Sequence, residues 1–101
     1  MSEQASSIVL IVDKFPLGRL LITPGALEKL EEQEKNPQEF LSRHAAGDWG
    51  NLDAHDWAEN ELSLREGFRL FSAYRLADDD KIWIITEADR SATTILLPDE
   101  Y

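Results

Sequence analysis

The period of the apolar residues changes once along this chain, at Gly67 and Phe68, from helical spacing to alternation. Three segments before this point have helix-start residues, and the segments after it have the alternation of strands. Because a run of helices followed by strands cannot make repeated strand–helix–strand units, a doubly wound parallel sheet is excluded. The sequence predicts an α+β fold, with about three helices packed on one face of an antiparallel sheet of about four strands.

The three predicted helices begin at residues that can cap them. Thr23 precedes Pro24 and Asn36 precedes Pro37, and proline suits the first helical position because no N–H is needed there. Asp53 is the third predicted cap. The predicted helices cover about residues 24–34, 37–46 and 54–66. In the third helix, these apolar residues are expected to face the core: Trp57, Ala58, Leu62 and Leu64.

The last third of the chain is predicted to form a three-stranded antiparallel meander, over residues 68–76, 81–87 and 92–97. Residues 7–12 form another strand-like run, and we expect it to join the same sheet because its backbone needs hydrogen-bond partners. The first six residues, 1–6, are expected to be flexible. A length of 101 residues indicates one domain with one core.

The charge and the missing residue types limit the partners. Twenty acidic side chains against ten basic ones give a formal charge of −10, which disfavours direct binding to nucleic acid or to an anionic membrane. The chain has no cysteine, which excludes disulfides and thiolate metal sites and fits a cytoplasmic location. The five glycines are isolated and the histidines lack ligand spacing, so no cofactor and no metal are expected.

The polar stretch at residues 86–94 is the first candidate for a binding site. We expect Glu87, Asp89 and Arg90 to meet at the mouth of the hairpin between the last two strands. In the structural alternative, Asp89 bonds to backbone amides of the turn and Arg90 pairs with a surface carboxylate. The structural alternative is favoured, because turns between strands normally contain these residue types.

His44, near the end of the second predicted helix, is the second candidate, because an imidazole can titrate near neutral pH. It shares an inward stripe with Phe40 and Leu41, which favours a core histidine over a catalytic one. Helices followed by a meander also describe the compact toxin ribonucleases. In that alternative, His44, Glu87 and Arg90 are the acid, base and phosphate-binding groups, although the negative charge argues against it.

Trp83, Ile85 and Phe71 are expected on the sheet face opposite Ile82 and Ile84. If the helices cover the face of Ile82 and Ile84, the other three residues form an exposed apolar patch. Such a patch is a candidate binding surface for a partner or for a homodimer through the sheet face.

The helical region has its own charge. Residues 28–66 contain eleven acidic and four basic side chains, a net charge of −7, which favours a basic host protein as partner. The predicted function is therefore a non-enzymatic protein-interaction module. A small metal-independent ribonuclease is the alternative.

Four stretches carry a resemblance to a known family: residues 15–30, 43–53, 60–74 and 81–101. They are similar to a family of small uncharacterised bacterial proteins found on plasmids and genomic islands, and residues 81–101 (KIWIITEADRSATTILLPDEY) are the clearest part. The four stretches together cover most of the chain. The resemblance implies a cytoplasmic accessory protein that travels with mobile DNA, and it brings no activity or site residues with it.

Overall fold

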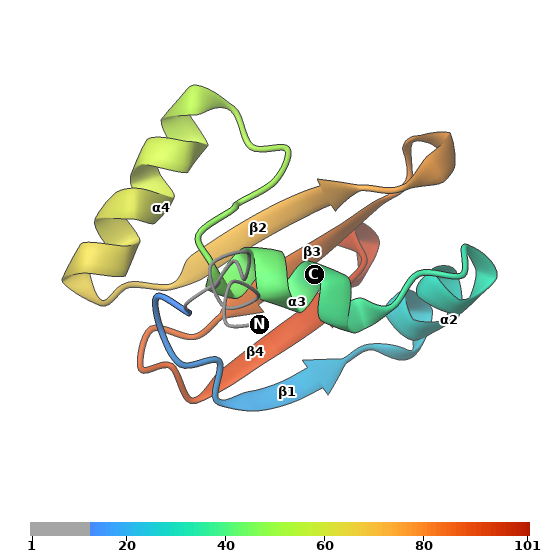
Figure 1. The fold of residues 1–101 in the computed structure, drawn as a ribbon, viewed down its shortest axis with the longest axis horizontal. Coiled ribbons are helices and arrows are strands. Elements are labelled where there is room, and N and C mark those ends of the chain that lie inside the picture. Colours follow the sequence, from blue (N-terminus) through green and yellow to red (C-terminus); the bar gives the residue numbers. More distant parts are fainter. Residues whose placement is uncertain (1–12) are drawn as a thin grey trace, which may run out of the picture.

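The computed structural model describes residues 13–101. Within this part, the chain forms one short strand, three helices and three further strands, in that order (Figure 1). The strand predicted over residues 7–12 and the flexible start predicted over residues 1–6 lie outside the described residues.

The helices begin where the sequence predicts. Thr23, Asn36 and Asp53 each accept a hydrogen bond from a backbone amide of the first turn, at 3.2, 2.9 and 2.8 Å. These bonds satisfy N–H groups that have no partner inside the helix. The helices are α2 (Pro24–Glu32), α3 (Pro37–Ala45) and α4 (Ala54–Glu66). Gly67, with a φ of 79°, ends α4 in the left-handed conformation.

The four strands of the sheet are β1 (Arg19–Ile22), β2 (Leu70–Arg75), β3 (Lys81–Thr86) and β4 (Ala92–Leu96). Their order across the sheet is β1-β4-β3-β2. Strands β2, β3 and β4 form the predicted antiparallel meander, whereas β1 runs parallel to β4. Parallel neighbours need a long crossover, and the helices and the meander between β1 and β4 provide it. Short 3-10 turns follow β2 and β4, at Ala77–Asp79 and Pro98–Glu100.

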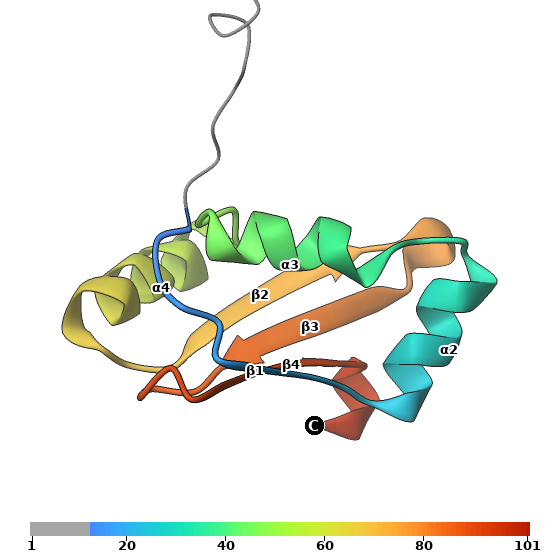
Figure 2. The same ribbon diagram turned by 60° about the horizontal axis from the view of Figure 1, so that its bottom comes forward.

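The helices lie on one face of the sheet, as predicted. Helix α3 crosses this face, and α2 and α4 lie toward its two ends (Figures 1 and 2). Helices α2 and α3 enclose the larger part of the core, made of Ala26, Leu30, Phe40, Leu41, Tyr74, Leu76, Ile82, Ile84 and Ile95. Helix α4 and the loops beside it enclose a smaller cluster around Phe15, Trp49 and Leu70.

No α-helix of residues 13–101 covers the opposite face, which we call the open face; the short 3-10 turn at Pro98–Glu100 lies on this side (Figure 2). The strand register and the alternation of side chains place eleven strand residues on it. They are Arg19, Leu21, Phe71, Ala73, Arg75, Lys81, Trp83, Ile85, Ala92, Thr94 and Leu96.

Helix α4 differs from its predicted orientation. Ala58 and Leu62, predicted to face the core, are exposed, whereas Trp57 and Leu64 do pack against the smaller cluster. The buried residue of α4 is Asn60. Helix α4 lies against the edge strand β2 as well as against the apolar cluster. At the centre of α4, the Asn60 side chain bonds to the backbone of Phe71 in β2, whose polar groups need partners.

The outer edge of β2 is paired with the loop that follows α3. The N–H of Ala73 donates to the carbonyl of Trp49 at 3.2 Å, and the N–H of Asn51 donates to the carbonyl of Ala73 at 2.6 Å. The Asn51 side chain also accepts a bond from the N–H of Arg75 at 2.7 Å. The loop therefore occupies this edge as a short strand would.

Candidate functional site

The two polar candidates of the sequence meet in one buried hydrogen-bond network. His44 Nδ1 lies 2.5 Å from Ser72 Oγ, and His44 Nε2 lies 2.9 Å from Thr86 Oγ1. Thr86 Oγ1 lies 2.7 Å from Thr93 Oγ1, which donates to the carbonyl of Leu17 at 2.7 Å. The four side chains are buried, so the network joins α3 to β2, β3 and β4 through the core.

The network defines its own proton positions. A carbonyl only accepts, so the Thr93 hydroxyl uses its proton on Leu17 and must accept from Thr86. Thr86 then accepts from His44 Nε2–H. The hydrogen-bond chain thus places a proton on Nε2 of His44, and in the neutral ring Nδ1 accepts from the Ser72 hydroxyl.

The surroundings of His44 keep it neutral. Burial, together with the nearby charge of Arg90, lowers the pKa of His44 to about 3. The rings of Phe15 and Trp49 stand edge-on to the imidazole, at centroid distances of 5.3 and 5.5 Å. His44 is therefore a hydrogen-bonded core residue, as its place on the inward stripe of α3 indicates.

Arg90 holds the β3–β4 hairpin against the end of α4. Its Nη1 donates to the carbonyls of Phe68 at 2.6 Å and Glu87 at 3.2 Å, and its Nη2 donates to the carbonyl of Ser63 at 3.3 Å. The sequence-based expectation of a carboxylate partner is therefore corrected: the partners are backbone carbonyls. A cation near the C-terminal end of a helix is favoured by the helix dipole.

The remaining polar candidates are Asp89 and Glu87, at the turn between β3 and β4. Asp89 Oδ1 accepts from the backbone N–H of Ser91 at 3.0 Å, and bonds from the hydroxyl and the amide of Ser91 lower the pKa of Asp89. Glu87 is exposed, and its carbonyl rather than its carboxylate contacts Arg90. The alternative catalytic set of His44, Glu87 and Arg90 is thus not presented on one surface, because His44 is buried in the core.

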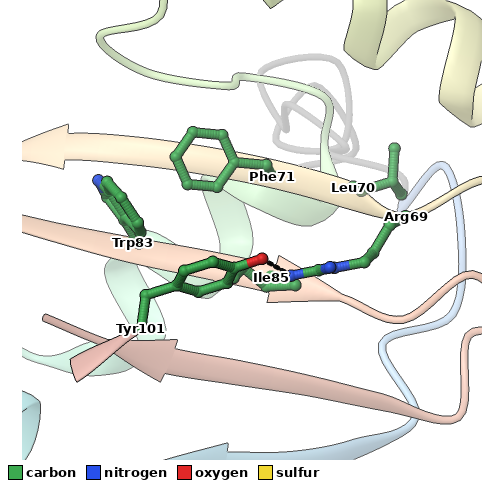
Figure 3. Close-up of a pocket in the computed structure, with 6 residues that line it drawn as sticks. All are labelled: Arg69, Leu70, Phe71, Trp83, Ile85 and Tyr101. Atoms are coloured by element: carbon green, nitrogen blue, oxygen red, sulfur yellow. Dashed lines mark hydrogen bonds between the residues drawn. The ribbon is translucent and has the colours of Figure 1, made fainter. Parts of the chain in front are cut away.

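The open face has a shallow pocket of about 340 Å³ between aromatic side chains (Figure 3). Phe71 and Trp83 meet edge to face, with ring centroids 5.0 Å apart, and Trp83 meets Tyr101 at 5.8 Å. Phe71 and Trp83 are half-buried, Ile85 is buried, and Tyr101 is 70% exposed. Three of the predicted binding residues, Phe71, Trp83 and Ile85, therefore line one pocket.

Arg69 and Tyr101 form the end of this pocket. Arg69 Nη2 donates to Tyr101 Oη at 2.8 Å, and the guanidinium carbon lies 5.5 Å from the centroid of the Tyr101 ring. Figure 3 shows the Tyr101 ring reaching toward Arg69 along the open face. The pocket thus combines apolar walls with one cationic group at its end.

The charge of the strands is opposite in sign to that of the chain. The four strands contain no acidic residue, although the chain has twenty. Their basic residues, Arg19, Arg75 and Lys81, all project from the open face, and Arg69 adds a fourth cation at the pocket. Arg75 lies 3.9 Å from Asp79, and no described carboxylate lies within 4.0 Å of Arg19 or Arg69.

Sequence reasoning missed Arg69, Tyr101 and the positive sign of this face. Counting acidic residues within the predicted strands would have revealed the sign, because the alternation already places Arg69, Phe71 and Arg75 together. Tyr101 carries no such signal. It reaches the pocket because the turn at Pro98–Glu100 brings it back beneath β3.

Comparisons of the chain with protein-family models, with curated proteins and with solved structures found no match.

Proposed function

We propose that this protein is a non-enzymatic protein-interaction module that binds its partner through the open face of its sheet. The observation that carries the proposal is the pocket between Phe71, Trp83 and Tyr101, on the face that no described α-helix covers. Tryptophan, tyrosine and arginine are the residues that dominate binding energy at protein interfaces. All three types meet in this pocket, since Arg69 closes its end.

The polar candidates support the same proposal. His44 and Arg90 have structural partners in the fold, so their hydrogen-bonding groups are engaged in the core and at the hairpin. The open face, by contrast, presents aromatic groups that a partner can contact. An apolar patch of this kind on a small protein is typical of an interaction site.

The resemblance to plasmid and genomic-island proteins adds a setting to the proposal: a cytoplasmic accessory protein that travels with mobile DNA. In the described part of the chain, no helix has the length and apolar character needed to cross a bilayer. A basic host protein at the acidic helical side stays a prediction of the sequence.

The test is affinity capture from bacterial lysate with wild type and two variants that remove exposed aromatic rings. Tyr101→Ala removes a wall of the pocket, and Phe68→Ala removes a ring that is 55% exposed outside it. We expect a protein partner that wild type and Phe68→Ala retain and that Tyr101→Ala loses by about tenfold or more. A partner lost equally with both variants, or RNA cleavage by the pure protein, contradicts the proposal.

A further inference from the structure

We propose that the open face binds an extended acidic segment of a partner protein, with one apolar side chain in the pocket and carboxylates on the surrounding cations. This inference rests on the proposed function and specifies the chemistry of the partner. It follows from three properties of the face: its charge, the position of its pocket and the spacing of its cations.

The charge is the first property. In a chain of net charge −10, the charged strand residues of this face are all basic: Arg19, Arg75 and Lys81, with Arg69 beside them. Asp79, Asp80 and Asp99 lie beside Lys81 at one end of the face, and Asp79 is 3.9 Å from Arg75, so Arg69 is the cation farther from carboxylates. Arg69 and Arg75 are both exposed, and a guanidinium can bind a carboxylate through two parallel hydrogen bonds. Among the described side chains, Arg69 has one hydrogen-bond acceptor, the Oη atom of Tyr101. The other N–H groups of the Arg69 guanidinium can therefore donate to a ligand.

The position of the pocket is the second property. The walls of the pocket are Phe71, Trp83, Ile85 and Tyr101, and its polar end is Arg69. An aliphatic or aromatic side chain seated there would be covered by rings on two sides, and its neighbours along the segment would meet the cations. A pocket that combines apolar walls with one charged group fixes both the position and the orientation of a bound side chain.

The spacing of the cations is the third property. Arg69 and Arg75 lie at opposite ends of β2, about 20 Å apart along an extended strand, which is the length of about six residues of a bound extended segment. Lys81 pairs with Arg75 in the sheet, so the two stand at the same end. The face therefore fits acidic residues at both ends of a segment and an apolar residue between them.

Two other occupants fit the charge less well. A second copy of this chain stacked face to face would bring the four cations of each copy together, and like charges in contact repel. A nucleic acid strand would match these cations locally, but its remaining phosphates would meet the field of the twenty acidic side chains. A short acidic segment avoids both conflicts.

The experiment is a selection of random peptides displayed on phage against the immobilised full chain, followed by binding measurements with a selected peptide. We expect enrichment of Asp and Glu on both sides of Leu, Phe, Trp or Met. The synthetic peptide should bind at least about tenfold more weakly when its Asp and Glu become Asn and Gln, and more weakly at high salt. Selection of basic or uncharged peptides, or of none, overturns the inference.

Charge-reversal variants assign the binding to the face. Arg69→Glu and Arg75→Glu should each weaken the acidic peptide by about tenfold or more, whereas Arg65→Glu, on the exposed side of α4, should change it less than about twofold. If Tyr101→Ala abolishes binding but charge reversal does not, the proposed function stands and this inference fails. If neither has an effect, both fail.

Two further measurements identify the competing occupants. A thymidine oligonucleotide that displaces the peptide overturns the inference in favour of nucleic acid. A dimer in sedimentation velocity that Tyr101→Ala dissociates overturns it in favour of a second copy.

Discussion

The side-chain amide of Asn60 bonds both the backbone N–H and the backbone carbonyl of Phe71, so helix α4 continues the pairing of β2 where a further strand would. The bond from the Phe71 N–H to Asn60 Oδ1 is 3.1 Å long, and Asn60 is 5% exposed. Together with residues 49–51, Asn60 satisfies the outer edge of β2. This closure leaves the open face, rather than the edge of β2, as the accessible part of this side of the sheet.

Replacing Asn60 should destabilise the fold strongly. In Asn60→Ala, two partly buried backbone groups of Phe71 lose their partner, and we expect a loss of about 2–4 kcal/mol in the free energy of unfolding. Urea denaturation measures this value. Glu59→Ala, at the exposed neighbouring position, is the control and should change it by less than about 0.5 kcal/mol. Similar values for both variants would show that Asn60 does not hold the edge.

Gly50 and Gly67 provide a matched pair, because both have a φ of 79°. A Cβ at Gly50 would collide with the carbonyl of Ala73 and the ring of Tyr74, whereas a Cβ at Gly67 would meet no atom within 4 Å. Gly67→Ala should therefore show only the left-handed strain, about 1–2 kcal/mol. Gly50→Ala should lose at least about 3 kcal/mol in the same urea assay. Equal losses contradict the close approach of the loop to β2.

The lowered pKa of His44 leads us to expect that the free energy of unfolding depends on pH. Folding lowers its pKa from 6.5 to about 3, so between these pH values the unfolded chain binds a proton that the folded chain does not. The contribution of neutral His44 is therefore complete above pH 6.5 and falls by about 1.4 kcal/mol per pH unit as the pH drops toward 3.

The variant His44→Gln tests this dependence, because glutamine cannot titrate. The stability advantage of wild type over His44→Gln, from urea denaturation at a series of pH values, should shrink with acidification. Gln38→Ala, at an exposed position of α3, removes no titratable group and should keep the wild-type pH profile. An advantage that is constant with pH would mean that folding does not lower the pKa of His44.

Two variants of Arg90 separate the contribution of its hydrogen bonds to stability from that of its backbone conformation. Arg90 has a φ of 62°, which glycine adopts without strain and alanine does not. Both Arg90→Gly and Arg90→Ala lose the bonds to Phe68 and Ser63, and we expect Arg90→Ala, which keeps the strained backbone, to lose about 1.5–3 kcal/mol in the free energy of unfolding. Arg90→Gly should lose about 1 kcal/mol less, because glycine relieves the left-handed strain. If Arg90→Gly keeps wild-type stability, the relief of strain offsets the lost guanidinium bonds, and these bonds contribute no more than about 1 kcal/mol.

The local elements could be predicted because their signals lie within a few residues of one another. The caps Thr23, Asn36 and Asp53 bond to amides two or three residues ahead, so sequence spacing is sufficient to identify them. The register of alternation likewise places Phe71 and Trp83 on one face. The parallel pairing of β1 with β4 has no such signal, because Leu20 and Thr93 meet across most of the chain.

The candidate site was predicted in part for the same reason. The apolar residues Phe71, Trp83 and Ile85 follow from alternation, but Tyr101 joins them only after the chain turns back under β3. The partners of Arg90 are carbonyls, and a carbonyl occurs at every residue, so no residue type in the sequence identifies them.

The sequence by itself determined the helices, the meander, the two faces of each strand and the total charge, since these depend on near neighbours, on periodicity or on composition. Only the tertiary structure decided that His44 is enclosed by Ser72 and Thr86, and that the strands turn their few cations to the uncovered face. These outcomes depend on which distant segments pack together. That choice is made by burial of the whole core rather than by any local pattern.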